Sequence, residues 1–486
     1  MKENVLKNRN LSDNLRAAIL YVAMFIAFAA SAQTKEVTIL AVNDIHATID
    51  RFPKFIALVD SMRTVYPDLL LFSAGDNRTG NPASDMYADA FPVVRLMNKA
   101  GFNLSAVGNH EFDGKTDGLQ SVINNSNFSY VCANMYTHDS LRLHVEPYRI
   151  IENNGVRIAV LGLLQTGISG LPDTHPDNVK NVKFRKWEKV AEEYSWLRQQ
   201  CDIFVLLVHE EYPECVEFLQ QYPYADVLIG SHTHKPIRET ELHNGVLITQ
   251  ADSHLKYVTH ITLQLTDGTV TKKESRLLDV NAFSRKDEEV QAMVDQFNNN
   301  EALQRVLTQV ITDFGSYEEL GYLMTDAIRA AAGADIAFQN PGGVRLATFP
   351  KGPMTVRDVY RLDPFNNEAI VFNLTGDELL RLIEAVYIAE NKQPPYVSGI
   401  NFEMELDGQK QIKNLQVKME DGSRLNLQRS YKVVMNSYIA AISKYQKADT
   451  GQSLYRTTAE LTIEYLEKQP ALDYKGVKRM LIIKNQ

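Results

Sequence analysis

The chain has 486 residues, 44% of them apolar and 23% charged, as is typical of a soluble globular protein. One hydrophobic core rarely grows beyond about 250–300 residues, so this length predicts at least two domains. A formal charge of −9 argues against a general nucleic-acid binder, which needs a basic excess. The three widely spaced cysteines, Cys132, Cys201 and Cys215, exclude a disulfide scaffold or a cysteine-rich zinc module.

The first 32 residues have the pattern of an export signal. Basic residues precede an apolar stretch from Ala17 to Ala29, and the small residues Ala30-Ser31-Ala32 follow it. The stretch is too short for a comfortable membrane span, so we predict a cleaved signal peptide over residues 1–32, with a retained anchor as the alternative. The C-terminus has no hydrophobic tail. We therefore expect an exported protein, periplasmic or extracellular, with no stable membrane anchor after cleavage.

Short apolar runs alternate with amphipathic segments of helical period through the first half of the chain. The runs have the composition of buried strands and cover residues 37–42, 69–72, 104–107, 156–160, 203–208 and 227–229. A hairpin-like pair with an Asp267-Gly268 turn follows. We predict an α/β domain over 33–283, a connecting helical hinge over 284–316, and a second, smaller α/β domain over 317–486.

The residues that follow these runs carry the chemistry. The runs are followed by Asn43-Asp44-Ile45-His46, Gly75-Asp76, Gly108-Asn109-His110-Glu111, His209 and Gly230-Ser231-His232-Thr233-His234. Because ligands collect at the carboxyl ends of strands in an α/β sheet, we expect these side chains at one edge. Carboxylate, imidazole and amide ligands without a thiolate suit Zn²⁺, Mn²⁺ or Fe²⁺ and exclude a structural zinc knuckle.

This set of ligands is large enough for two divalent metal ions. We predict two sites that share one carboxylate: Asp44, His46, Asp76 and His234 for the first, and Asp76, Asn109, His209 and His232 for the second. Two cations about 3.5–4 Å apart lower the pKa of a shared water and clamp both oxygens of an in-line phosphoryl displacement. Each motif alone has an ordinary interpretation, such as a helix N-cap for Asp76 or a core histidine for His209. The ordered series at strand ends favours the metal sites.

The series resembles that of the calcineurin-like metallophosphoesterases, and Asn109-His-Glu-Phe-Asp113 is similar to a motif of the secreted 5′-nucleotidase/UDP-sugar hydrolase family. In that family the histidine and aspartate of the motif lie beside the metals and assist the phosphoryl transition state. The resemblance therefore implies His110 and Asp113 as catalytic residues. A histidine held by a carboxylate can donate to charge that develops on phosphoryl or leaving oxygens. The alternative for Asp113 is a capping or turn residue before Gly114.

The second half resembles the same family. Asn340-Pro-Gly-Gly-Val-Arg345 is similar to its Asn-x-Gly-Gly-x-Arg loop, and Asp363–Asn367 to its Pro-Phe-x-Asn segment. A Gly-Gly turn lets backbone approach a ligand, and an arginine suits a phosphate. The resemblance implies that Phe365 stacks on the base and that the loop contacts substrate through Asn340, Gly342, Gly343 and Arg345. The alternatives are a plain turn for the glycines and a core position for Phe365.

Two motifs depart from the family. Between Val306 and Ile328, where the family has an arginine, no Lys or Arg occurs. The segment Ser437–Tyr445 stands where the family has Gly-Gly-Asp-Gly and an aromatic ring, and Tyr445 is the candidate for that ring. The metal site is complete, whereas the specificity site is altered.

Taken together, the residues and the resemblance imply an α/β protein with an N-terminal metallophosphoesterase sandwich and a smaller α/β substrate-binding domain. The expected function is exported, metal-dependent hydrolysis of nucleoside 5′-monophosphates, with in-line attack of a metal-bound hydroxide. The hinge would bring the two domains together. One alternative is a UDP-sugar, a cyclic nucleotide or a non-nucleotide ester as substrate, and another is a nucleotide-binding protein that has lost catalysis. The preferred substrate, the metals and the oligomeric state stay open.

Overall fold

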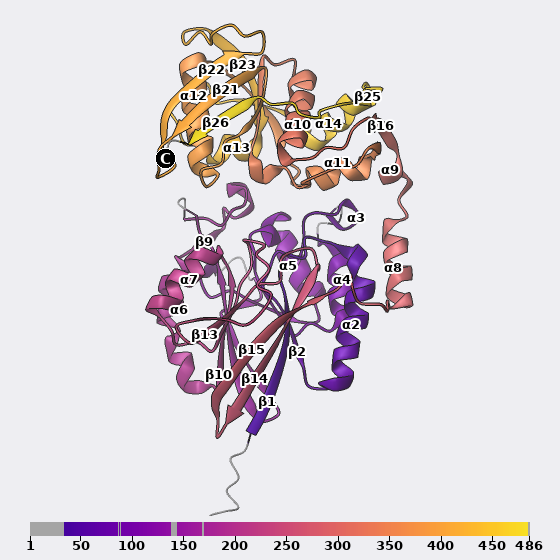
Figure 1. Ribbon diagram of the computed structural model, residues 1–486, viewed down its shortest axis with the longest axis vertical. Helices are drawn as coiled ribbons and strands as arrows, with labels where there is room; N and C mark the ends of the chain where they lie inside the picture. Colours follow the sequence, from indigo (N-terminus) through magenta and orange to yellow (C-terminus); the bar gives the residue numbers. More distant parts are fainter. Residues whose placement is uncertain (1–33, 86, 88, 138–142, 168–169, 485–486) are drawn as a thin grey trace, which may run out of the picture.

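The computed structural model describes residues 34–85, 87, 89–137, 143–167 and 170–484. The predicted signal peptide lies outside these residues. Figure 1 shows two units stacked along the long axis, with residues 34–279 in the lower unit and 306–484 in the upper one. Of the helices in the described part of the chain, none is long and apolar enough to cross a membrane.

The lower unit contains two sheets. Within the described residues the first sheet has the order β15 (Thr269–Asp279), β14 (Tyr257–Thr266), β1 (Thr34–Val42), β2 (Leu70–Ser73), β3 (Leu104–Ala106), β4 (Ser129–Val131) and β6 (Val145–Glu146). The second has the order β12 (Glu241–His243), β13 (Val246–Thr249), β11 (Val227–Ile229), β10 (Ile203–His209), β8 (Val156–Leu164) and β7 (Tyr148–Asn153). Parallel pairs lie at the centre of each sheet, so the carboxyl ends of these strands share one edge.

The two sheets pack face to face between layers of helices. Val37 and Phe72 of one sheet share a buried cluster with Val160 and Val205 of the other. The outer faces are covered by α2 (Phe52–Val65), α4 (Phe91–Ala100) and α5 (Lys115–Asn125) on one side, and by α6 (Trp187–Glu193) and α7 (Tyr212–Gln221) on the other. This covering explains why β10 is apolar at nearly every position, since a strand buried on both faces has no solvent side.

The upper unit is a mixed α/β unit. Its described strands have the orders β20 (Tyr396–Ser398), β17 (Ile336–Gln339), β23 (Ser430–Asn436), β19 (Glu368–Thr375) and β24 (Gln452–Thr457); β22 (Ile412–Met419), β21 (Ile400–Leu406) and β26 (Met480–Lys484); and β18 (Gly352–Thr355), β16 (Val306–Val310) and β25 (Ala471–Leu472). The helices are α10 (Tyr317–Ala332), α11 (Val356–Leu362), α12 (Gly376–Ala389), α13 (Ser437–Ile442) and α14 (Thr458–Glu467). The sandwich and this smaller second unit confirm the predicted α/β class.

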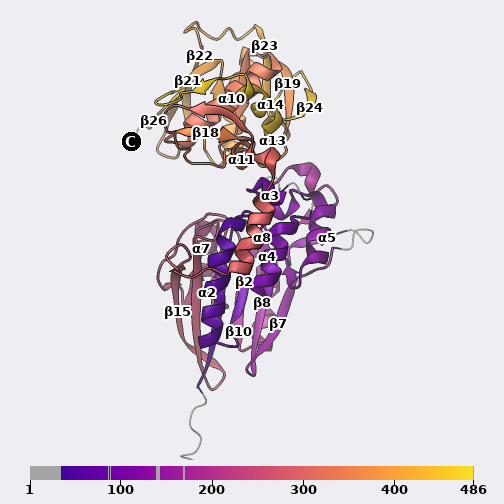
Figure 2. The ribbon, with the colours of Figure 1, turned by 90° about the vertical axis from the view of Figure 1, so that its right-hand side faces the viewer.

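Helix α8 (Glu288–Asn298) connects the two units, followed by the short α9 (Glu301–Gln304). Figures 1 and 2 both show α8 lying alongside α2, and Val290 and Val294 of α8 are buried there. Strand β16 lies within the predicted hinge range 284–316, but it pairs with β18 and β25 of the upper unit. The domain boundaries at 283 and 316 stay a proposal.

The remaining short elements lie mainly in connections. They are α3 (Pro82–Asp85), the paired strands β5 (Met135–Thr137) and β9 (Val182–Phe184), and the 3-10 turns Ile49–Arg51, His110–Phe112, Pro176–Asn178, Ser195–Gln200 and Pro341–Gly343. The Asp267-Gly268 turn joins β14 to β15, as the sequence predicts.

Candidate metal centre and interdomain cavity

The predicted ligands all follow parallel strands of the two sheets and meet at one edge. Asp44 and Asp76 are almost fully buried, and His209 is the last residue of β10. Positive φ angles of 47° to 69° occur at five of the ligand positions: Asp44, His46, Asp76, His232 and His234. Such conformations cost about 1–3 kcal/mol each, so the surrounding structure must hold these loops in place.

Hydrogen bonds between the loops supply that restraint. The backbone N–H of Asp44 donates to the Gly75 carbonyl at 3.0 Å, and that of His46 donates to the Asp76 carbonyl at 3.0 Å. The buried carboxylate of Glu111 accepts from the backbone N–H groups of Asp76 at 2.9 Å, Asn77 at 2.8 Å and Gly108 at 2.6 Å. Glu111 therefore ties the loop after β2 to the loop after β3.

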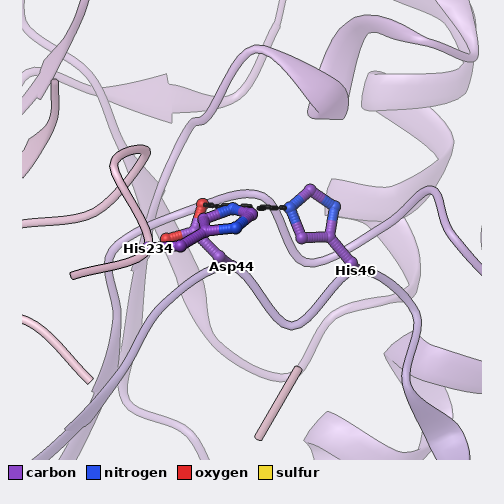
Figure 3. Close-up of side chains that lie close together, drawn as sticks. All are labelled: Asp44, His46 and His234. Carbon is purple, nitrogen blue, oxygen red and sulfur yellow. Dashed lines mark hydrogen bonds and ion pairs between the residues drawn. The ribbon is translucent and has the colours of Figure 1, made fainter. Parts of the chain in front are cut away.

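The ligand atoms converge into three overlapping groups. Each group has its ligand atoms within 4.8 Å of one another: Asp44, His46 and His234; His46, Asp76 and His110; and Asp76, His209 and His232. Figure 3 shows the first group, in which His234 Nε2 lies 3.3 Å from Asp44 Oδ1 and 3.2 Å from His46 Nε2. Asn109 joins the third group, with Oδ1 3.1 Å from His209 Nε2.

Two of the imidazoles are oriented by oxygen atoms close to their Nδ1 atoms. His46 Nδ1 lies 3.0 Å from the Thr79 carbonyl, and His209 Nδ1 lies 2.9 Å from the Ala74 carbonyl and 2.7 Å from Ser231 Oγ. A proton held on Nδ1 by these oxygens leaves Nε2 free to face the ligand groups, as is usual for metal-binding histidines.

The donor set fits divalent cations. Among the ion pairs of the described residues, Asp44 and Asp76 have only imidazole partners. Burial raises the pKa of both carboxyl groups, but neighbouring imidazoles, chiefly His234 and His209, outweigh it and lower both values. Burial lowers the pKa of His209, yet Asp76 and Asp44 raise it to about 10. Protonated imidazoles balance the charge of these buried carboxylates, and the same N and O atoms are the ligand types, at suitable spacing, that would hold a divalent cation in place of those protons.

His110 and Asp113 form a pair beside these groups. His110 Nδ1 lies 2.7 Å from Asp113 Oδ2, and His110 Nε2 lies 3.9 Å from Asp76 Oδ2. The 3-10 turn His110–Phe112 fixes this arrangement, because the His110 backbone N–H also donates to Asp76 Oδ1 at 2.9 Å. Burial lowers the pKa of His110, but Asp76 and Asp113 raise it overall.

Beside this pair lies a cavity of about 200 Å³ that is lined by residues of both units. The lower unit contributes His110 and Asp113, and its other lining residues include Asn109, Asp173 and His232. The upper unit contributes five of the six predicted substrate residues, and its other lining residues include Glu390 and Tyr438; the five are Asn340, Gly342, Gly343, Arg345 and Phe365. Arg345 Nη2 lies 3.1 Å from His46 Nε2, and the Phe365 ring stacks on the His110 ring at 5.6 Å between centroids.

The structure places Tyr445 elsewhere. Its ring packs against the hydrophobic core of the upper unit, with Lys447 Nζ 4.8 Å from the ring centroid, and it does not line the cavity. Helix α13 begins at Ser437, with the Asn436 side chain accepting from the Ile439 N–H, and Tyr438 in its first turn lines the cavity instead. Tyr438 therefore replaces Tyr445 as the candidate second ring.

Sequence reasoning assigned no role to Glu111, Glu390 or Tyr438. Glu111 lies within the quoted Asn109–Asp113 motif directly after a predicted strand, and this position was the available signal. Glu390 follows a helix in a segment without a motif, and only the tertiary structure brings it to the cavity.

Comparisons with known proteins agree with this geometry. The family model for calcineurin-like phosphoesterase matches residues 37–236, and that for the 5′-nucleotidase C-terminal domain matches residues 304–448. The chain is 27% identical to protein UshA of Yersinia enterocolitica, over 91% of this chain and 92% of that protein. It is 26% identical to endonuclease YhcR of Bacillus subtilis over 84% of this chain, but it spans 37% of that protein's length. The structure of a 5′-nucleotidase precursor from Thermus thermophilus shares the fold, with a TM-score of 0.81 at 23% identity over 92% of this chain and 99% of that one.

Proposed function

We propose that this chain, which belongs to the family that joins a calcineurin-like phosphoesterase domain to a 5′-nucleotidase C-terminal domain, is an exported phosphomonoesterase that releases phosphate from nucleoside 5′-monophosphates. The observation that carries the proposal is the shared cavity. Asn109 and His232 of the predicted ligands and the His110–Asp113 pair line this space from one unit, and Asn340, Arg345 and Phe365 line it from the other. A phosphate ester that fills it would contact both sets.

Two divalent ions are proposed at the ligand edge. Asp44, His46, Asp76 and His234 would hold one, and Asp76, Asn109, His209 and His232 the other. When bound, such ions supply Lewis acidity toward the phosphoryl group and a water of lowered pKa.

The side chains of the cavity have separate tasks in this proposal. Asp113 orients His110 through Nδ1, so that Nε2 can donate to charge that develops on a phosphoryl or leaving oxygen. Arg345 neutralises phosphate charge through its planar guanidinium. Phe365 offers a face on which any nucleobase can stack, with Tyr438 as a second ring.

Substrate entry requires some contacts to open. Phe365 stacks on His110, and Arg345 Nη2 lies 3.1 Å from His46 Nε2. We propose that the units separate and close about residues 284–316, since α8 and α9 form the connection between them.

Phosphate release by the chain without residues 1–32, supplied with Mn²⁺ or Zn²⁺, tests the proposal. AMP is compared with glycerol phosphate by phosphate release, and with UDP-glucose and cyclic AMP by loss of the substrate, because hydrolysis of these two first gives phosphomonoesters and no inorganic phosphate. His110→Ala is expected to lower AMP turnover by about 10²–10⁴-fold, whereas His144→Ala, at an exposed position of the same unit, should not.

The outcomes separate the alternatives. Turnover of the other esters without AMP turnover would keep the phosphoesterase chemistry and refute the nucleotide substrate. AMP binding without turnover of any ester would favour a binding protein. Export is tested separately, by N-terminal sequencing of the protein recovered outside the cytoplasm, for which a start at Gln33 is expected.

A further inference from the structure

Glu390 presents a carboxylate to the cavity from the end of α12. Its Oε2 accepts a hydrogen bond from the Gly342 N–H at 3.1 Å, and both carboxylate oxygens lie 3.3 Å from Asn340 Nδ2. These contacts fix the carboxylate on the loop that also carries Arg345. An acidic side chain at a helix C-terminus interacts unfavourably with the helix dipole, so helix stability does not explain this residue.

The surroundings of Glu390 contain little positive charge. Among the described residues that line the cavity, Arg345 is the only Lys or Arg, and its guanidinium reaches His46 instead. The other two carboxylates have imidazole neighbours, because Asp113 pairs with His110 and Asp173 Oδ2 lies 3.5 Å from His232 Nε2. No ion pair of Glu390 occurs among the described residues, and its two protein partners are neutral donors.

Acceptor capacity remains on this carboxylate. A carboxylate has about four acceptor positions, and the loop donors use two or three of them. Burial raises the pKa of Glu390 to about 7, with the Gly342 and Asn340 hydrogen bonds opposing the rise. Above that pH the group is an acceptor that lacks a cation, and a ligand donor in the cavity would satisfy it.

We propose that Glu390 determines substrate specificity: it accepts hydrogen bonds from hydroxyl or amine groups of the part of the ester that leaves, and it repels a second phosphate. The preferred substrates are then phosphomonoesters of alcohols that carry hydrogen-bond donors, and nucleoside diphosphates are disfavoured. The inference rests on the proposed phosphoesterase function and adds the substrate class to it.

The test compares AMP, 2′,3′-dideoxy-AMP and ADP at pH 8.5, where Glu390 is ionised, by kcat/KM and by equilibrium binding. Wild type is expected to favour AMP over dideoxy-AMP by about 10- to 100-fold, the effect of a hydrogen bond to a charged group. In Glu390→Gln both this preference and the preference for AMP over ADP should fall about tenfold. Glu390→Asp, which keeps the charge, should retain the discrimination against ADP.

A matched control is Glu384→Gln, at an exposed position on the same helix, which should keep the wild-type ratios. Equal kcat/KM for AMP and dideoxy-AMP in wild type would overturn the inference without any variant. Unchanged ratios in a folded Glu390→Gln protein would overturn it as well. Failure of the proposed function is distinguishable, because wild type would then not turn over AMP, whether or not it hydrolyses para-nitrophenyl phosphate, while the binding ratios would still test Glu390.

Discussion

Replacement of Glu111 by glutamine tests how the ligand loops are held. The Glu111 carboxylate, 1% exposed, accepts from three backbone N–H groups, at 2.9 Å from Asp76, 2.8 Å from Asn77 and 2.6 Å from Gly108. A glutamine keeps one oxygen, which can serve Asp76 and Gly108, and turns an NH₂ group toward the Asn77 N–H. The change removes charge assistance from two hydrogen bonds and leaves two buried donors, the Asn77 N–H and the glutamine NH₂, facing each other without an acceptor.

The cost follows from these contacts. A hydrogen bond to a charged group contributes about 1.5–3 kcal/mol and a neutral one about 1 kcal/mol, while an unpaired buried donor costs about 1–3 kcal/mol. Burial and the Asp76 charge raise the pKa of Glu111, so relief of this carboxylate offsets part of the loss. We expect Glu111→Gln to lower the free energy of unfolding by about 3 kcal/mol, or Tm by about 6–12 °C for a unit of 150–250 residues.

Glu111→Gln should also weaken metal binding, because the Glu111 carboxylate holds the backbone of Asp76, one of the predicted ligands, in place. Loss of such a supporting partner typically costs 10–100-fold in metal affinity. Calorimetric scans of the chelator-treated protein and Mn²⁺ titrations measure the two effects, with Glu152→Gln, exposed on β7, as the control. A Glu111→Gln protein with wild-type Tm and wild-type Mn²⁺ affinity would refute the role of this carboxylate in holding the loops.

Three further predictions concern the metal centre and the upper unit. In Gly108→Ala, the added Cβ would overlap Asp76 Oδ1, so Mn²⁺ affinity should fall by at least about 100-fold. The control Gly408→Ala, with no atom within 4 Å of its added Cβ, should keep the wild-type affinity, and equal titrations of the two variants would contradict this prediction. Chelation should lower Tm and added Mn²⁺ should restore it, because Asp44 and Asp76 otherwise have only imidazole ion-pair partners among the described residues; a Tm indifferent to Mn²⁺ would count against a metal site. Burial raises the pKa of Asp363 from 3.8 to about 6, so the folded state binds more protons between these values and stability falls as pH rises through that window. In urea unfolding, the free energy of unfolding of Asp363→Asn should fall between pH 4 and 7 by about 3 kcal/mol less than that of wild type. Parallel pH profiles of the two proteins would exclude Asp363 as the cause of the fall.

The strands and the ligand edge could be predicted because both depend on local sequence. Buried parallel strands are continuous apolar runs, so the run at 203–208 and its terminal His209 are visible without tertiary information. The strand ends of an α/β sheet share one edge, which places Asp44 beside His234 across 190 residues of chain. The structure brings together all seven predicted ligands, although their role in binding metal stays a prediction.

The side of the cavity formed by Glu390 and Tyr438, here called the specificity wall, could not be predicted, because it depends on where one helix ends and another begins. Glu390 reaches the cavity through the end of α12, and Tyr438 through the Asn436 cap that starts α13. Tyr445 lies seven positions after Tyr438, and no motif in this segment indicates which ring lies outside the core.

This contrast has a physical cause in the backbone of the two regions. The ligand loops hold left-handed conformations at Asp44, Asp76 and His232, and they are bound to one another by backbone hydrogen bonds. A changed residue there must satisfy the conformation, the interloop bonds and the ligand geometry together, so the motif tolerates little variation. None of these constraints applies to Glu390, because its φ is −95° and its carboxylate contacts a loop amide and an asparagine side chain. Substrate preference can therefore change at this wall while the metal motifs keep their sequence, which is why motif resemblance supports the reaction class more strongly than it supports the substrate.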